Sequence, residues 1–295
     1  MIALGAVATA PWLLCVLMAR VVHRGDRWLV PATAVIVLPS VALVLAVSAA
    51  ASALAVGTVL VTAGSRWFSV MGVALLALVA WRIVEVFRHL LRVRSSSRAA
   101  AEFGHRADPR TRLLVIDDDE PDAFAVASGG GAVVMTSGLV AQLSDDEVNA
   151  LVLHERAHLR YRHQVSVQLT EVATQLVPPL RGASSAVRHA AERHADECAA
   201  HGDRRLAMTS LARAALVCSR GTGGSGSAAL ASTGGDVVRR VRALSGPPPA
   251  PQRRIVVAVA VVLVVFACAL TAALADVVQD VVSPESGEVS TDMFR

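Results

Sequence analysis

The sequence contains no lysine and few aromatic side chains. All 28 basic residues are arginine, and aromatic residues make up only 4% of the chain. A basic chain with a net charge of +4 raises the question of nucleic-acid binding. Here, however, the arginines stand beside long apolar runs, which favours a membrane surface as their partner. We therefore expect no direct nucleic-acid binding. The composition, rich in alanine and valine, is typical of a bacterial protein from a GC-rich genome.

Cysteine is also scarce, and its spacing excludes two classes of protein. The chain has no CxxC pair, and two of its cysteines lie inside apolar runs. This pattern predicts neither a disulfide framework nor a zinc site built from cysteine. The four residues are Cys15, Cys198, Cys218 and Cys268.

Long uncharged runs are abundant, and they account for a hydrophobic fraction of 54% that exceeds the usual value for soluble proteins. About 20 apolar residues form a helix that crosses a bilayer core of ~30 Å. The second run is longer, and Pro31 and Pro39 are expected to delay or kink its start. The sequence predicts a mainly α-helical membrane protein with four transmembrane helices, at about 2–22, 33–63, 66–88 and 255–275.

Arginine placement predicts the orientation of these helices. Clusters follow the first and third runs and precede the fourth, whereas only Arg66 separates the second from the third. Because arginine-rich loops stay in the cytoplasm, we expect a multi-pass plasma-membrane protein with both termini outside. The predicted division is 1–91 for three membrane helices, 92–220 for a cytoplasmic domain, 221–254 for a connecting segment, 255–275 for the fourth helix and 276–295 for a short acidic outer tail.

The connecting segment has three predicted parts. GTGGSGS at 221–227 is typical of a flexible loop, and SGPPPAPQ at 245–252 is typical of a stiffer linker. Between them, the stretch 236–244 reads DVVRRVRAL and predicts a short basic helix. We expect this helix to lie on the cytoplasmic membrane surface.

The stretch LVLHERAHLRYRHQ, at 151–164, predicts a helix that carries two histidines. Ser144 is a suitable N-cap, and Glu147 completes a capping box, so the helix is expected to run from about 144 to 163. His154 and His158 are four residues apart and therefore project from one face.

Two histidines at this spacing can hold one metal ion, while the neighbouring Glu155 can act as general base toward a water molecule. The alternative is a buried helix with two hydrogen-bonded histidines, and a third ligand decides between the two interpretations. In RHAAERHADECAAH, at 188–201, Glu192 would complete a site with two histidines and one glutamate. Asp196, one turn later, would accept a hydrogen bond from a ligand histidine, most readily His154.

Other histidines nearby are rival ligands. We expect each of them to be solvated or close to the membrane, because none adds the paired glutamate and aspartate. They are His163, His189, His194 and His201.

HERAH followed by ERHAD resembles the HExxH…ExxxD pattern of the membrane gluzincins. The resemblance covers about 113–203 and implies an α+β zincin domain with one zinc ion per chain, held by His154, His158 and Glu192. Two related families share the pattern: the prenyl-protein and heat-shock-type membrane peptidases, and the BlaR/MecR-type antirepressor peptidases. This chain has three apolar runs before the domain and one after it, an order that is more similar to that of the antirepressor type. That type carries an extracellular penicillin-binding domain where this chain has a short tail, so we expect no direct β-lactam sensing.

The segment before the zinc helix resembles the strand, turn and helix of these families. AVVMT at 132–136 is apolar and β-prone, and the glycines at 129–131 permit a hairpin turn. An exposed edge strand beside the metal could pair with an extended substrate. Val133, Val134 and Met135 are accordingly predicted to bind substrate, the alternative being an ordinary inner strand.

The predicted function is a membrane zinc endopeptidase that hydrolyses peptide bonds of a cytosolic protein. The antirepressor resemblance favours a winged-helix repressor as substrate, which would make the protein part of a regulatory switch. One alternative is quality control of membrane proteins, as in the heat-shock type. Another is a non-catalytic membrane scaffold, which the intact Glu155 disfavours. A peptidase also needs a residue that stabilises the oxyanion of the tetrahedral intermediate. The candidates are Tyr161, Arg193 and His194, and the sequence does not select one of them.

Overall fold

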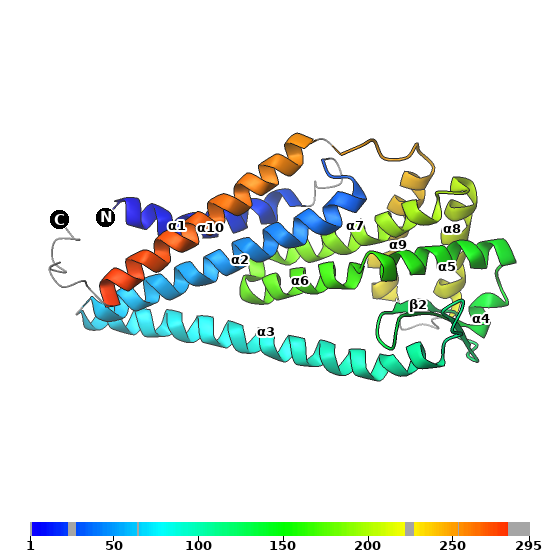
Figure 1. The fold of residues 1–295 in the computed structure, drawn as a ribbon, viewed down its shortest axis with the longest axis horizontal. Helices are drawn as coiled ribbons and strands as arrows, with labels where there is room; N and C mark the ends of the chain where they lie inside the picture. The colour runs from blue at the N-terminus through cyan, green and yellow to red at the C-terminus, as the bar shows by residue number, and fades with distance from the viewer. Residues whose placement is uncertain (1, 23–27, 64, 222–226, 253, 283–295) are drawn as a thin grey trace.

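The computed structural model describes residues 2–22, 28–63, 65–221, 227–252 and 254–282. Figure 1 shows an elongated helical bundle with a small sheet at one end. The elements are, in chain order, α1 (Ile2–Val21), α2 (Pro31–Thr62), α3 (Arg66–Arg106), β1 (Leu113–Ile116), β2 (Ala123–Val126), β3 (Ala132–Thr136), α4 (Ser137–Val140), α5 (Asp145–Arg160), α6 (His163–Leu176), η2 (Pro178–Leu180), α7 (Arg181–Ala199), α8 (Arg204–Gly221), α9 (Ser227–Leu244) and α10 (Arg254–Val282).

Helix α2 forms the centre of the bundle and contacts α1, α3, α6, α7 and α10. Small residues allow these helices to approach closely, as is common for helices in membranes. A Cβ atom on Gly72 would lie only 2.6 Å from the carbonyl oxygen of Gly57, so the α2–α3 contact requires glycine there. The hydroxyl of Ser48 donates to the carbonyl of Ala267, which joins α2 to α10.

Three of the described helices are long and apolar enough to cross a membrane, namely α2, α3 and α10 up to Asp276. In α1 the apolar stretch found is shorter, Ala8–Val21, so a fourth span remains a prediction. The helix that contains the third predicted span, α3, continues well beyond residue 88, to Arg106. Its 41 residues correspond to roughly 60 Å at ~1.5 Å per residue, which exceeds a bilayer core.

The hairpin of α6, η2 and α7 packs into the membrane bundle. Its tip buries Val177 and Leu180 in one cluster with Cys15 and Met18 of α1 and Leu45 of α2. Farther along, the imidazole of His89 on α3 lies 2.8 Å from the amide oxygen of Gln168 on α6. The segment that carries the predicted peptidase motif therefore shares a hydrophobic core with the apolar helices.

The three strands form one sheet in the order β1-β3-β2, with β1 parallel and β2 antiparallel to β3. The predicted glycine turn is confirmed, since Gly129, Gly130 and Gly131 have positive φ angles and join β2 to β3. The prediction that 132–136 is an exposed edge strand is wrong. β3 is the central strand, because β2 pairs with one of its edges and β1 with the other. Val133, Val134 and Met135 are therefore fully buried and cannot bind substrate.

Candidate metal centre

The motif helix α5 begins as predicted and ends earlier. The hydroxyl oxygen of Ser144 accepts from the N–H of Glu147, and the carboxylate of Glu147 accepts from the N–H of Ser144, which confirms the capping box. The helix ends at Arg160, because Arg162 adopts a left-handed conformation with φ 51°. A new helix, α6, then starts at His163, and this break separates His163 from the motif helix.

The structure brings together the three predicted metal ligands. His154 and His158 come from α5 and Glu192 comes from α7, and one candidate ligand atom of each lies within 4.8 Å of the others. The Nε2 atoms of His154 and His158 are 3.4 and 3.6 Å from the Glu192 carboxylate oxygens. Two imidazoles and one carboxylate are donors that a catalytic zinc ion takes, and the spacing leaves room for one ion between them.

Asp196 holds the first of these histidines. Its carboxylate lies 3.1 Å from Nδ1 of His154 and is almost completely buried. Burial alone would lower the pKa of His154, but Asp196 and Glu192 outweigh it and raise that pKa to about 9. Since Nδ1–H donates to Asp196, the Nε2 atom is directed toward Glu192 and the proposed metal position.

The second histidine is held by another imidazole. Nδ1 of His163 lies 3.1 Å from Nδ1 of His158, and Nε2 of His163 lies 3.0 Å from Nδ1 of His194. If Nε2 of His158 takes the metal, its Nδ1–H donates to His163, and the Nε2–H of His163 then donates to His194. Burial lowers the pKa of His163 to about 3, so this imidazole is neutral at ordinary pH.

The prediction for the rival histidines is therefore wrong in part. His163 is only 1% exposed, because the break after α5 directs it back into the protein. His189 is also buried, and its Nδ1 lies 2.5 Å from a carboxylate oxygen of Asp236. His194 is half-buried and His201 is exposed.

Arg240 on α9 completes the site and was not predicted. Its guanidinium donates two hydrogen bonds to Asp196, at 2.7 and 2.8 Å, and a third nitrogen lies 3.0 Å from Glu192. Burial would raise the pKa of both carboxyl groups, but this cation and His154 reverse the effect. The pKa of Glu192 falls to about 2, and that of Asp196 falls well below its usual range.

This arrangement changes the interpretation of the basic helix, which was expected on the membrane surface. Arg240 is only 8% exposed and lies in the site. A buried carboxylate such as Asp196, with Glu192 one turn before it on the same helix, requires a cation, so the sequence did contain a signal. It did not indicate which arginine of DVVRRVRAL would supply that cation.

Glu155 faces a large apolar cavity. The cavity, of about 1060 Å³, lies between α5, α7, α8 and α9 and reaches Asp122 and Ala123 at the start of β2. Burial raises the pKa of Glu155 to about 7, which suits a group that exchanges protons near neutral pH. None of the three residues considered for the oxyanion is among the described residues that line this cavity.

Comparison with known proteins places these residues in a family. The sequence profile of Peptidase family M48 matches residues 88–247, which is more than half of the chain. A relative named "Protease HtpX homolog", from Acidiphilium cryptum (strain JF-5), is 34% identical over 64 residues. That alignment covers 21% of this chain and 22% of the relative, so the two are similar over about a fifth of their lengths. No solved structure matches.

Proposed function

The chain belongs to peptidase family M48, and on that premise we propose that it is an integral-membrane zinc endopeptidase. One observation carries the proposal: His154, His158 and Glu192 converge beside Glu155 at the wall of an apolar cavity. The long apolar helices α2, α3 and α10 support a location in the membrane. A non-catalytic scaffold would not need a glutamate with a raised pKa, as Glu155 has, next to the candidate ligands.

The side chains of this site have separate roles in the proposed reaction. A bound zinc ion would polarise the scissile carbonyl and lower the pKa of a nearby water molecule. Glu155 takes the proton of the attacking water and then gives it to the leaving amine. Asp196 and Arg240 keep His154 and Glu192 in position during these steps.

The cavity indicates the kind of peptide that binds. Most of its wall consists of alanine, leucine and valine side chains, so extended segments with apolar side chains fit best. The edge strand at the site is β2, in place of the predicted β3. In the antiparallel register the backbone of Ala123 and Ala125 faces away from β3, where a substrate strand can pair. The N–H of Ala123 donates to the Asp122 carboxylate at 2.8 Å, and a substrate carbonyl would replace it.

For the biological substrate we propose membrane or misfolded proteins, as in the heat-shock-type peptidases. The similarity to a relative named as an HtpX protease homologue favours this alternative. The comparisons do not single out the antirepressor type, so cleavage of one winged-helix repressor is the second candidate. Its support is the order of apolar segments, with three before the peptidase motif and one after it.

One experiment tests activity and substrate together. New protein N-termini are compared in cells that carry the wild-type chain, Glu155→Gln, or the matched control Glu102→Gln, whose side chain is exposed on α3. Many cut membrane proteins, absent only with Glu155→Gln, would support quality control, and one cut DNA-binding protein would support the repressor switch. Identical N-termini in all three strains would contradict a constitutively active peptidase.

We propose that the peptidase segment faces the cytoplasm and that both termini lie outside, following the arginine clusters. Single cysteines introduced at His201 and at Thr62, in a chain without its native cysteines, test this. The prediction is that a membrane-impermeant thiol reagent labels the Thr62 site in intact cells and the His201 site only after permeabilisation. The reverse pattern would contradict the orientation.

A further inference from the structure

A second cavity lies at the boundary between the apolar helices and the peptidase segment. It has a volume of about 470 Å³ and is enclosed by the start of α2, the middle of α7, Arg239 of α9 and residues 249–252. One wall is apolar, because Leu29 and Ala34 pack with Ala190 and Val256 in one cluster. The other wall carries His189, Arg193 and Arg239.

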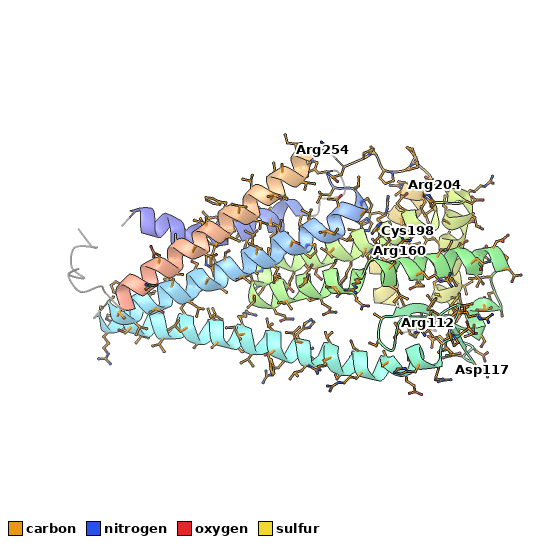
Figure 2. The ribbon with its side chains drawn as sticks, in the orientation of Figure 1. Arg112, Asp117, Arg160, Cys198, Arg204 and Arg254 are labelled. Atoms are coloured by element: carbon orange, nitrogen blue, oxygen red, sulfur yellow. The ribbon has the colours of Figure 1, made fainter. Side chains whose placement is uncertain are left out.

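The basic wall has more cations than carboxylates. Glu197 accepts two hydrogen bonds from Arg204, the first residue of α8, and one from Arg193; Arg204 is labelled in Figure 2. Asp236 is shared in the same way between Arg239 and His189. Three guanidinium groups thus share two carboxylates in this region. Of these residues only Arg193 and Arg239 line the cavity, so the formally charged side chains at its wall are cations.

Arg193 also has an unfilled hydrogen-bonding position. Its Nε atom is buried and has no partner, and no other buried side-chain nitrogen or oxygen of the described residues is in this state. An unpaired buried donor is costly, so an acceptor that this atom could reach after a small shift of the Arg193 side chain would stabilise it. The N-terminus of the 32-residue helix α2 opens at the same cavity, where the side-chain oxygen of Gln252 accepts a hydrogen bond from the N–H of the N-cap residue Val30 at 2.7 Å. The partial positive charge of this helix end adds to the basic character of the cavity.

We propose that this cavity binds the phosphate head group of an anionic phospholipid. The apolar wall belongs to helices that begin here and run into the apolar bundle, so the acyl chains of a lipid can follow α2 and α10. Half-exposed Trp28 at the rim has the amphipathic side chain that prefers the head-group level. Basic pockets between membrane helices are known to bind such head groups.

The position of the cavity gives the lipid a structural consequence. His189 and Arg193 precede and follow Glu192 on α7, and Arg239 is next to Arg240 on α9. A phosphate between Arg193 and Arg239 would therefore connect α7, which carries Glu192 and Asp196, to α9, which carries Arg240.

Binding of phosphatidylglycerol to the purified full-length chain tests the proposal. The purified chain is exchanged into phosphatidylcholine nanodiscs, and the amount of phosphatidylglycerol that each chain retains is measured. The wild-type chain is compared with the variants Arg193→Gln and Arg239→Gln. The matched control is Arg94→Gln, which removes an exposed arginine of α3. We expect each cavity variant to weaken lipid binding about fivefold, the effect of one basic residue at a membrane surface, and the control to leave it unchanged.

Two further outcomes decide the assignment. Equal weakening in all three variants would overturn the proposal, since it would show general attraction of an arginine-rich protein to anionic lipid. Competition by inorganic phosphate alone, without specific lipid retention, would assign the cavity to a soluble anion and would also overturn it. If Arg193→Gln misfolds, Arg239→Gln still tests the site, because the Arg239 side chain is 60% exposed.

Discussion

At the scale of single residues, the proposed chemistry depends on Glu155 and on the groups around the candidate metal ligands. Burial acts in opposite directions on them: it raises the pKa of Glu155 to about 7 and lowers that of His158 to about 4. His158 is therefore neutral at neutral pH, the form in which an imidazole binds a metal. Glu155 titrates in the range where a general base is most effective.

The first prediction follows from the pKa of Glu155. As the proposed base, this carboxyl group must be ionised, so kcat/KM for a peptide substrate should rise with pH. A bound zinc dication lowers the pKa of a nearby carboxyl group, so the midpoint of the rise should lie at or below about 7. One unit below that midpoint, roughly a tenth of the plateau activity should remain. Peptide hydrolysis by the purified protein across the neutral range measures this profile. A rate independent of pH there would contradict the assignment, and Glu155→Gln should lower the plateau by at least ~10²-fold while zinc binding remains.

The second prediction concerns the imidazole behind His158. Replacing His163 by alanine leaves Nδ1 of His158 without its acceptor, so zinc affinity should fall by about 10- to 100-fold. Competition with a chelating dye measures the affinity without requiring activity. His163→Gln can accept from His158 and donate to His194, so it should retain more affinity than His163→Ala. The exposed His201→Ala is the control, and equal affinity in both alanine variants would refute a role for His163.

At the scale of elements, four helices build the site, and they differ in how well their residues could be predicted. On α5 and on α7 the site residues are four positions apart, and residues at this spacing lie on the same face of a helix. For this reason the pairs His154 and His158, and Glu192 and Asp196, could be chosen from the sequence. Contacts between elements are different. The partner of Asp196 comes from α9, 44 residues later in the chain, and no local pattern connects the two.

The third prediction tests this contact between α7 and α9. Arg240→Ala leaves Asp196 buried without its cation, so the free energy of unfolding should fall by about 3–5 kcal/mol. Thermal unfolding of the purified protein, followed by circular dichroism, measures the change. The exposed Arg242→Ala on the same helix is the matched control and should change stability little. Similar unfolding curves for the two variants would show that Arg240 does not stabilise the site.

At the scale of the whole molecule, the peptidase segment and the membrane helices are one packed structure. The α6–η2–α7 hairpin buries its tip against α1 and α2. The same α7 continues into Glu192 and Asp196, so the candidate metal centre is attached to the membrane bundle by a continuous helix.

The fourth prediction is that residues 92–247 do not form an independent soluble domain. Removing α1 and α2 would expose Val177 and Leu180, which are 1% and 0% exposed in the full chain. Apolar patches of this kind promote association. Size-exclusion chromatography of the excised piece should show self-association, and the double change Val177→Ser and Leu180→Ser should reduce it. A monodisperse unmodified piece would contradict the shared core.

Features that depend on local periodicity could be predicted from the residues alone. Apolar runs indicate the long helices, a capping box starts α5, glycines make the β2–β3 turn, and helical spacing selects the candidate ligands. Each of these signals lies within one or two helical turns or one hairpin, where backbone geometry alone decides which side chains meet.

Only the tertiary structure decided what depends on packing between distant segments. The parallel pairing of β1 made β3 an inner strand and left β2 at the edge. The left-handed Arg162 turned His163 inward, and the fold of α9 brought Arg240 to the buried carboxylate of Asp196 and the partly exposed one of Glu192. These contacts arise because buried charges and unpaired backbone groups must find partners wherever the chain brings them close. A sequence shows that such partners are needed, and the fold selects them.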